Sequence, residues 1–356
     1  MATHTTHRAH TTDTTHAPRT PRATRARTVF FDEIGGPEVL TLREVALDEP
    51  GPGEVRVRVD AVGLNRAEAL FRSGDYYYPA TLPGSRLGYE ASGVVESVGA
   101  GVTAFAPGDP VLTGPGIEMS AQGVYAERVV LPVDSVLPRP APLDAVTGAA
   151  LWLAYSSAYG GLVEVGGLRA GDHVVINAAS SGVGVAAIQT AARIGAFPVA
   201  VTRTAAKRQR LLDLGAARVI VSDEEDVPKE VRRLTDGRGA ELVFDAVGGP
   251  GLPELATAAT TGGTVVTYGW LGGGTMRMPL NWPLTVHGYN NVEMTSTAEG
   301  RRRVNAFLAS GVQDGSLRPV VGEVLHGLER IGDAHRLLES NAHVGKVVVT
   351  VEHGDG

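Results

Sequence analysis

One stretch of the sequence alternates apolar strands with helices and places a glycine turn after the first strand. Residues 173–177 (HVVIN) form an apolar strand, 178–195 supply a turn and a long alanine-rich helix, and 197–202 (FPVAVT) form a second strand. Two more apolar strands follow at 242–246 and 264–268. Strands that are apolar on both faces and alternate with helices indicate a parallel sheet covered on both sides. This stretch therefore predicts a doubly wound α/β domain.

The glycine turn has the properties of a phosphate-binding loop. Gly182 and Gly184 let the backbone turn sharply, and the helix that starts there offers free N–H groups and a positive dipole end to a diphosphate. The usual dinucleotide fingerprint is G-x-G-x-x-G, whereas this chain has Ala178 and Ala179 before Ser181. A tight turn without a ligand is the alternative. The position of the turn between an apolar strand and a long helix favours a dinucleotide site.

The end of the second strand indicates which nicotinamide cofactor binds. A site for NAD would have Asp or Glu there, about 20 residues beyond the glycines, to bind the ribose 2′-hydroxyl. This chain has Thr202, Arg203 and Lys207 instead. Cations suit a 2′-phosphate through charge-assisted hydrogen bonds, although solvated helix charges are the alternative. The sequence predicts NADPH.

The chain before this stretch has the pattern of short strands. Residues 54–62 (EVRVRVDAV) alternate apolar and polar side chains, as a half-buried strand does. Gly and Pro separate this strand from similar segments at 94–98, 108–112 and 125–131. A chain of 356 residues exceeds the usual size of one core, so we expect a β-rich domain followed by the α/β domain. Helices are predicted at 145–165, 301–310 and 331–340, and a closing strand at 346–351.

The composition excludes several classes of protein. The chain has no cysteine, which excludes disulfides, thiol catalysis and cysteine-containing zinc sites, and fits a reducing cytoplasm. A net charge of −7 provides no basic excess for nucleic acid, and no apolar run approaches the roughly 20 residues of a membrane-spanning helix. Residues 1–27 are mainly Thr, His, Ala and Arg. Because they have too few apolar side chains to bury, we expect a disordered tail.

Several motifs in order resemble the medium-chain dehydrogenase/reductase superfamily, and specifically its zinc-independent quinone oxidoreductase branch with zeta-crystallin-like proteins. The resemblance covers nearly everything from Thr28 to Glu352. The motifs are GLNRAEALFRSGDYYYPATLPGSRLGYEASGVVESVGAGVTAFAPGDPV, NAASSGVGVAAIQTAARIGA, FDAVGG, TVVTYG and HVGKVVVTV. The resemblance implies a GroES-like catalytic domain and a Rossmann-type nucleotide-binding domain.

The resemblance also implies a division of the chain. After the tail at 1–27, the first part of the catalytic domain spans 28–147. The NADPH-binding domain spans 148–288, and 289–356 return to the catalytic domain. Relatives commonly pair edge strands of this second domain across a two-fold axis. We therefore expect a homodimer, with 264–268 and the following WLGGGTMRMPL as the edge.

The resemblance allows the zinc question to be asked at each ligand position. Zinc-bearing members use a cysteine, the histidine of a G-H-E motif, and a further cysteine or acid. The matching positions here are Asn65, Tyr89 and Leu153. These side chains do not form a zinc ligand set, so Lewis-acid activation by zinc is not expected.

The remaining site residues are also implied by the resemblance. Asn65, a tyrosine within 76–78 (Tyr78 is our choice) and Ser157 are expected near the nicotinamide and the substrate. Asn65 could donate a hydrogen bond to a carbonyl, or it could simply cap a loop. Tyrosine stays protonated near neutral pH and could supply a proton, as could water. The expected cofactor-binding residues are Ser180, Ser181, Gly182, Val183, Gly184, Thr202, Arg203, Lys207, Val247, Gly248, Tyr268, Gly269 and Lys346.

Taken together, these features predict a metal-free enzyme. It would transfer hydride from NADPH to a quinone or to the C=C bond of an α,β-unsaturated carbonyl, either an enone or an enoyl thioester. The partner is then a small molecule, without nucleic acid or membrane. The alternative is an NADPH-binding protein of the same fold with a regulatory, structural or repurposed cyclase-like role.

Overall fold

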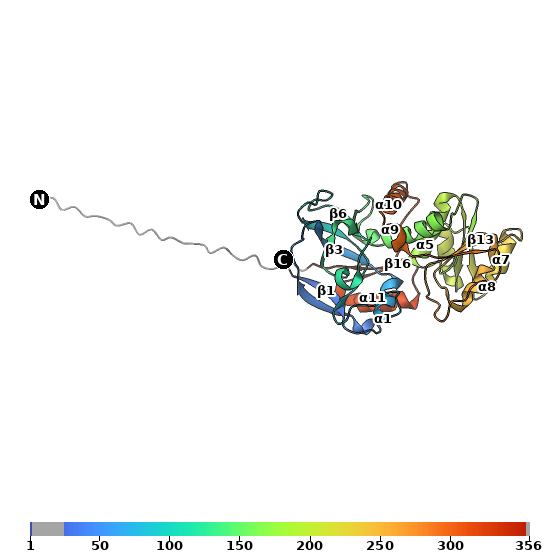
Figure 1. The fold of residues 1–356 in the computed structure, drawn as a ribbon, viewed down its shortest axis with the longest axis horizontal. Helices are drawn as coiled ribbons and strands as arrows, with labels where there is room; N and C mark the ends of the chain where they lie inside the picture. Colours follow the sequence, from blue (N-terminus) through green and yellow to red (C-terminus); the bar gives the residue numbers. More distant parts are fainter. Residues whose placement is uncertain (2–24, 354–356) are drawn as a thin grey trace.

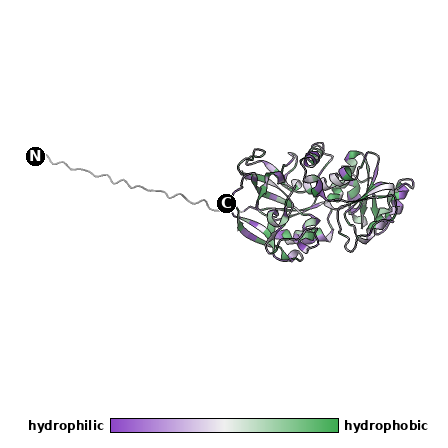
Figure 2. Ribbon diagram, viewed as in Figure 1, coloured by the Kyte–Doolittle hydropathy of each residue, from purple (hydrophilic) through white to green (hydrophobic). Residues whose placement is uncertain are grey.

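The structure is a computed structural model that describes residue 1 and residues 25–353. These residues form two lobes, with β16 (Lys346–Thr350) and α9 (Asn291–Thr295) near the junction (Figure 1). One lobe contains a mixed sheet and a small antiparallel sheet, and the other contains a parallel sheet. Apolar residues, green in Figure 2, occupy the strands of both lobes. Each lobe therefore has a core of its own.

The parallel sheet has the strand order β11–β10–β9–β12–β13–β14. Val174 and Ile176 belong to one apolar cluster and Val175, between them, to another, so both faces of the central strand are covered. The strands are β9 (His173–Ile176), β10 (Phe197–Thr202), β11 (Arg218–Val221), β12 (Ala240–Asp245), β13 (Ala259–Thr267) and β14 (Thr285–Gly288). The helices are α5 (Gly182–Ile194), α6 (Arg208–Asp213), α7 (Val227–Leu234) and α8 (Leu252–Ala256).

This strand order has a switch point between β9 and β12. The chain leaves these neighbouring strands in opposite directions, so a crevice opens beyond their carboxyl ends. Asn177 follows β9 there, and its Nδ2 donates to Oδ1 of Asp245, the last residue of β12, at 2.7 Å. Asp245 also accepts the N–H groups of Val247 and Gly248. These hydrogen bonds connect the end of β9 with the end of β12 and the loop after it.

The mixed sheet has the order β15–β16–β3–β5–β6–β8, with β7 also paired to β3. The C-terminal strand β16 pairs antiparallel with the end of β3, where Val348 lies opposite Gly63. The second sheet has the order β2–β1–β4. The strands are β1 (Arg25–Phe31), β2 (Thr41–Ala46), β3 (Glu54–Gly63), β4 (Ser85–Arg86), β5 (Glu90–Val98), β6 (Pro110–Thr113), β7 (Arg128–Pro132), β8 (Val136–Pro138) and β15 (Val321–His326).

The other helices connect the sheets, except that α10 packs on the lobe of the parallel sheet. They are α1 (Arg66–Ser73), α2 (Met119–Gln122), α3 (Ala145–Gly148), α4 (Trp152–Tyr159) with a π-helical extension (Gly160–Val165), α10 (Ala298–Gln313) and α11 (Ile331–Ser340). Short 3-10 helices are η1 (Pro37–Val39), η2 (Val133–Ser135), η4 (Ala205–Lys207), η5 (Gly249–Gly251) and η6 (Leu328–Arg330). Val304, Leu308 and Val312 of α10 share an apolar cluster with β9 and α5. We therefore propose that the chain returns to the lobe of the mixed sheet after α10 rather than at residue 289.

The predicted architecture is confirmed: an α/β lobe with a doubly wound parallel sheet lies beside a β-rich lobe. The segments predicted at 54–62, 331–340 and 346–351 correspond to β3, α11 and β16. The helix predicted at 145–165 is divided into α3, α4 and the π-helical extension. Among the described residues, no helix is both long and apolar enough to cross a membrane.

The prediction that 264–268 forms the edge of the parallel sheet is wrong. Beyond β13 lies β14, with Val265 opposite Val286. Strand β14 could not be recognised from the sequence, because its four residues are partly or fully exposed and show no alternation.

The last three residues of the tail predicted at 1–27 belong to a strand. Residues 2–24 lie outside the described part, but Arg25–Arg27 begin β1. Ala26 is buried there, and Arg27 forms a 2.7 Å ion pair with Glu127.

Candidate functional site

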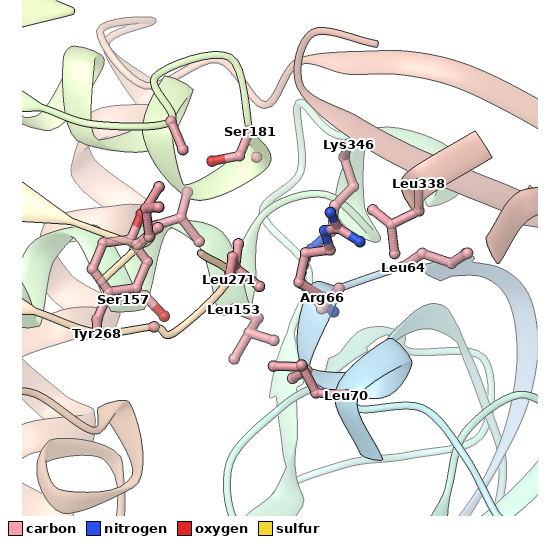
Figure 3. A pocket seen from close by; sticks show the side chains of 18 of the residues that line it. Leu64, Arg66, Leu70, Leu153, Ser157, Ser181, Tyr268, Leu271, Leu338 and Lys346 are labelled. Atoms are coloured by element: carbon pink, nitrogen blue, oxygen red, sulfur yellow. Dashed lines mark hydrogen bonds between the residues drawn. The ribbon is translucent and has the colours of Figure 1, made fainter. Parts of the chain in front are cut away.

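A cavity of about 1380 Å³ lies between the two lobes. Figure 3 shows Leu64, Arg66 and Leu70 on one wall and Ser181, Tyr268 and Leu271 on another, with Lys346 between them. The two walls come from α1 and the strand before it, and from the loops beyond the parallel sheet. The crevice at the switch point therefore opens into a chamber that both lobes enclose.

The glycine turn begins α5 at one end of this cavity. Ser181 is the N-cap, and its Oγ accepts the N–H of Gly184 at 3.0 Å. Gly182 and Val183 line the cavity, and the helix leaves their N–H groups without intrahelical partners. A Cβ on Gly184 would lie 2.6 Å from the Ala178 carbonyl oxygen, so this position requires glycine for close packing. The turn can accept an anionic group at the positive end of α5.

Two cations line the cavity beyond β10. The Lys207 ammonium donates to Ser180 Oγ at 3.1 Å and to the carbonyl oxygens of Asn341 at 2.5 Å and His343 at 3.0 Å. Arg203 lies exposed beside it. Burial, with help from the nearby Arg203, lowers the pKa of Lys207. Both predicted cations therefore lie at the cavity, and Lys207 also contacts the loop after α11.

A buried ion pair lies at the centre of the site. The Lys346 ammonium is 2.5 Å from Glu90 Oε2, and the two side chains are only 4% and 1% exposed. Lys346 also donates to Asn65 Oδ1. The other carboxylate oxygen of Glu90 accepts the N–H of Leu153 at 2.9 Å. The Lys346 side chain lines the cavity, but the protein already engages its charge.

The contacts of Asn65 determine the orientation of its amide. Because Lys346 can only donate, it must face Oδ1 of Asn65, and Nδ2 points the other way. Nδ2 donates to Glu68 Oε1 at 3.1 Å and to the Gly63 carbonyl at 3.3 Å. Both amide hydrogens are thus in use. Asn65 precedes α1 as its N-cap residue, so the loop-capping interpretation describes its contacts in this structure.

Glu68 lies in the first turn of α1, three residues after Asn65, and is fully buried. Its carboxylate accepts the backbone N–H of Asn65 and, at 3.1 Å, that of Tyr89. Burial raises the pKa of Glu68 to about 7, although Lys346 and these hydrogen bonds oppose the shift. Glu68 therefore connects the loop before α1 with the start of β5.

Three tyrosine hydroxyls form a chain at the apolar end of the cavity. The hydroxyl of Tyr89 donates to Tyr76 at 3.2 Å and lies 2.6 Å from that of Tyr78. Because Tyr89 uses its own proton toward Tyr76, Tyr78 must donate to Tyr89. The Tyr76 proton meets no acceptor within residues 25–353, and Tyr76 lines the cavity, so this hydroxyl can donate to a ligand. Burial raises the pKa of Tyr78 to about 12 and also raises the pKa values of Tyr76 and Tyr89.

The cavity brings together most of the predicted site residues. Those that line it are Asn65, Tyr78, Ser157, Ser180, Ser181, Gly182, Val183, Thr202, Arg203, Lys207, Val247, Tyr268, Gly269 and Lys346. The other two, Gly184 and Gly248, are buried and outside its lining. Ser157 lies near Tyr268 (Figure 3). A Cβ at Gly269 would collide with the Ala246 carbonyl oxygen.

Sequence reasoning preferred Tyr78 to Tyr76 within 76–78, and it gave Tyr89 and Arg66 no catalytic or binding role. Tyr76 had a signal, since it belongs to the YYYP run. Tyr89 was considered only as a zinc position. Arg66 had no sequence signal, because its contact with Asn341 joins residues 275 positions apart.

The residues present fit a dinucleotide but not a zinc ion. Open N–H groups at α5, cations after β10 and a cavity of about 1380 Å³ suit a molecule with several phosphates. Asn65, Tyr89 and Leu153, the three positions compared with zinc ligands, offer an engaged amide, a phenol in a hydroxyl chain and an alkyl group. Such a set does not hold zinc.

Comparisons with known proteins agree with this geometry. Residues 51–141 match the family model of the alcohol dehydrogenase GroES-like domain, and 182–309 match that of the zinc-binding dehydrogenases. The quinone oxidoreductase of Lama guanicoe is 31% identical over 333 residues, which cover 92% of this chain and 98% of the relative.

Solved structures are also similar. The Escherichia coli quinone oxidoreductase complexed with NADPH has a TM-score of 0.84 and 28% identity, over 91% of this chain and 99% of that one. An NAD-dependent alcohol dehydrogenase has a TM-score of 0.82 and 36% identity, over 92% of this chain and 100% of that one.

We expect the Lys346–Glu90 pair to hold the site together. Lys346→Met and Glu90→Gln should each lower the free energy of unfolding by about 3–5 kcal/mol, because each leaves a buried charge without its partner. The double variant should lose less than the sum of the two. Urea unfolding measures all three.

The exposed pair of Arg302 with Glu299 provides a matched control. Arg302→Met should leave the free energy of unfolding nearly unchanged, since solvent screens this pair. Strictly additive losses for Lys346→Met and Glu90→Gln would show that the two buried groups are not coupled.

Proposed function

The chain belongs to the zinc-independent quinone oxidoreductase branch of the medium-chain dehydrogenase/reductase superfamily, and from this premise we propose that it transfers hydride from NADPH to a quinone or a conjugated C=C bond. One observation carries the proposal. The phosphate-binding turn of α5 and the tyrosine hydroxyl chain lie on walls of the same cavity. A cofactor anchored at the turn would extend toward hydroxyls that can bind the oxygen of an acceptor.

The cofactor contacts follow from the residues around the turn. The N–H groups of Gly182 and Val183 would hold the diphosphate, and Ser180, Thr202, Arg203 and Lys207 line the cavity where the adenosine ribose is expected. The cations after β10 favour NADPH in this chain. Val247, Tyr268, Gly269 and Ser157 also line the cavity and would border the nicotinamide.

Reduced nicotinamide, when bound, supplies the hydride. The chain's own task is to orient the acceptor and to stabilise the negative charge that develops on its oxygen. Tyr76 donates to that oxygen, and its hydroxyl accepts from Tyr89, which in turn accepts from Tyr78. Such a chain of donors polarises its last member and strengthens the final hydrogen bond. For an enone, hydride adds to the β-carbon and leaves an enolate, and a proton from Tyr76 or water then adds to the α-carbon to give the saturated carbonyl compound.

Asn65 acts indirectly in this scheme. Its amide holds Lys346 and Glu68, and Glu68 accepts the backbone N–H of Tyr89. Asn65 therefore positions the residues that line the cavity, including the middle member of the tyrosine chain. Leu153 contributes an apolar wall at the same point.

We also propose a homodimer that forms through the exposed edge of β14. The segment before this strand exposes Met276, Met278, Leu280 and Trp282, with Leu280 77% and Trp282 68% exposed. Exposed apolar side chains next to a free strand edge suit pairing with a second copy. Sedimentation at the mass of a single chain at micromolar concentration would exclude this assembly.

Turnover tests the enzymatic proposal. The protein should oxidise NADPH in the presence of at least one member of a panel of quinones, enones and enoyl thioesters. The alternative is a non-redox, NADPH-binding role, and stopped-flow absorbance of the reduced nicotinamide distinguishes the two. Binding of NADPH without oxidation by any acceptor would favour the alternative.

Cofactor preference should depend on the cations after β10. Arg203→Ala combined with Lys207→Ala should weaken NADPH binding by roughly tenfold or more, because charge-assisted hydrogen bonds to the phosphate are lost. NADH binding should change little. Titration with both cofactors gives the ratio of dissociation constants, and an unchanged ratio would contradict the assignment.

The tyrosine chain should control turnover. Tyr76→Phe should lower kcat by roughly a hundredfold, the usual range for loss of a proton donor, and Tyr78→Phe and Tyr89→Phe should lower it less. Because the pKa of Tyr78 is about 12 and those of its partners are also raised, kcat should not decline from tyrosine ionisation below about pH 10.

Tyr77 is the matched control, since it adjoins the chain but its side chain is 52% exposed. Tyr77→Phe should retain full kcat and KM. Equal losses of kcat and of NADPH affinity in Tyr76→Phe would instead indicate a binding role.

A further inference from the structure

Cations from both lobes converge on the residue that ends α11. Asn341 adopts a left-handed conformation with φ of 57°. Its carbonyl oxygen accepts from Lys207, which belongs to the parallel-sheet lobe. Its side-chain Oδ1 accepts from the Arg66 guanidinium at 3.1 Å, and Arg66 begins α1 in the other lobe. Arg66 and Lys207 are therefore brought together at one residue.

The positive charge at this point has no matching acid. Within residues 25–353, no salt bridge involves Arg66, Arg203 or Lys207. Glu339 is close enough to act on Arg66, but its carboxylate pairs with Arg72 at 2.7 Å. Burial lowers the pKa of Arg66, and Arg203 lowers it further. An anion in the cavity would relieve this crowding of like charges.

Arg66 is placed to reach such an anion. It lines the cavity together with Arg203 and Lys207. Figure 3 shows its guanidinium extending from α1 across the gap, toward the side on which Lys346 and Ser181 lie. One contact to Asn341 leaves other N–H groups of its planar fork free, and that fork matches a phosphate better than an ammonium does.

We propose that Arg66 binds the 2′-phosphate of NADPH from the lobe opposite Arg203 and Lys207, so that this phosphate joins the two lobes. The inference rests on the proposed use of NADPH. The diphosphate is expected at the start of α5, whereas Arg66 meets Lys207 at Asn341, beside the end of β10 where the ribose is expected. A phosphate at that point contacts α1, the turn after β10 and the end of α11 together.

This arrangement makes recognition of the phosphate and closure of the cavity a single event. NADH would bind the parallel-sheet lobe through its diphosphate but would leave Arg66 without an anionic partner. NADPH would engage both walls and hold α1, with Asn65 at its N-cap, against the cofactor. Arg66 thus becomes a determinant of cofactor choice in a lobe that does not carry the dinucleotide turn.

The test compares dissociation constants for NADPH, NADH and 2′,5′-ADP in the full-length protein. Arg66→Ala should weaken NADPH and 2′,5′-ADP by roughly tenfold or more, as for loss of a charge-assisted hydrogen bond, and leave NADH nearly unchanged. Arg66→Lys should lose less, because it keeps the charge but not the fork. Arg336→Ala, which removes an exposed arginine of α11, is the control and should bind all three as the wild type does.

A second variant separates contact from folding. Asn341→Gly keeps the left-handed backbone and the carbonyl that Lys207 needs, but removes the amide that orients Arg66. It should weaken NADPH binding to an intermediate extent, with an unchanged thermal unfolding midpoint. Equal losses of NADPH and NADH in Arg66→Ala would place Arg66 at the diphosphate, and no loss would make it structural; either result overturns the inference. A wild type that binds NADH as tightly as NADPH would instead overturn the cofactor assignment, and this inference with it.

Discussion

The buried ion pair between Lys346 and Glu90 is the contact on which the site depends. Two charges that are almost wholly removed from water are stable only when each is paired and hydrogen-bonded. Lys346 begins the C-terminal strand, Glu90 begins β5, and Glu90 also accepts the N–H of Leu153 at the start of α4. The residue before Lys346 donates its N–H to Ser180 in the dinucleotide turn. One ion pair thus aligns both lobes at the cavity.

The same network supports the proposal that Asn65 acts as a positioning residue. A single asparagine cannot saturate a buried lysine and carboxylate and also offer a free donor to a substrate. The tyrosine hydroxyls meet the second requirement, because their chain ends in a Tyr76 proton that meets no acceptor among residues 25–353. The work that zinc performs in other branches of the superfamily, holding a carbonyl oxygen as its charge develops, is here assigned to phenols. Tyr89 in this chain occupies the position compared with a zinc-binding histidine.

Much of the fold could be predicted because its signals are local. The apolar strands 173–177 and 197–202 and the alternating 54–62 are periodic over their whole length. The edge strand β14 could not be predicted, because its four partly or fully exposed residues show no alternation of apolar and polar side chains. In the site, Ser181, Arg203 and Lys207 follow from their place in a βαβ unit. The contact between Arg66 and Asn341 could not be predicted, because no spacing rule connects residues 275 positions apart.

Charge placement connects these observations. Two acids behind the cavity wall are buried and engaged, Glu90 by Lys346 and Glu68 by Asn65 and Tyr89. Glu118, which lines the cavity, is exposed and accepts the backbone N–H groups of Ser120 and Ala121. The cations on the rim of the cavity lack salt-bridge partners among residues 25–353, and they come from both lobes. At the end of β10, the described residues that line the cavity include no Asp or Glu to bind a ribose 2′-hydroxyl. The apolar end of the cavity, with neutral phenols whose pKa values are raised, suits an uncharged carbonyl acceptor. In the proposed function, charge therefore orients the cofactor, and neutral donors face the acceptor.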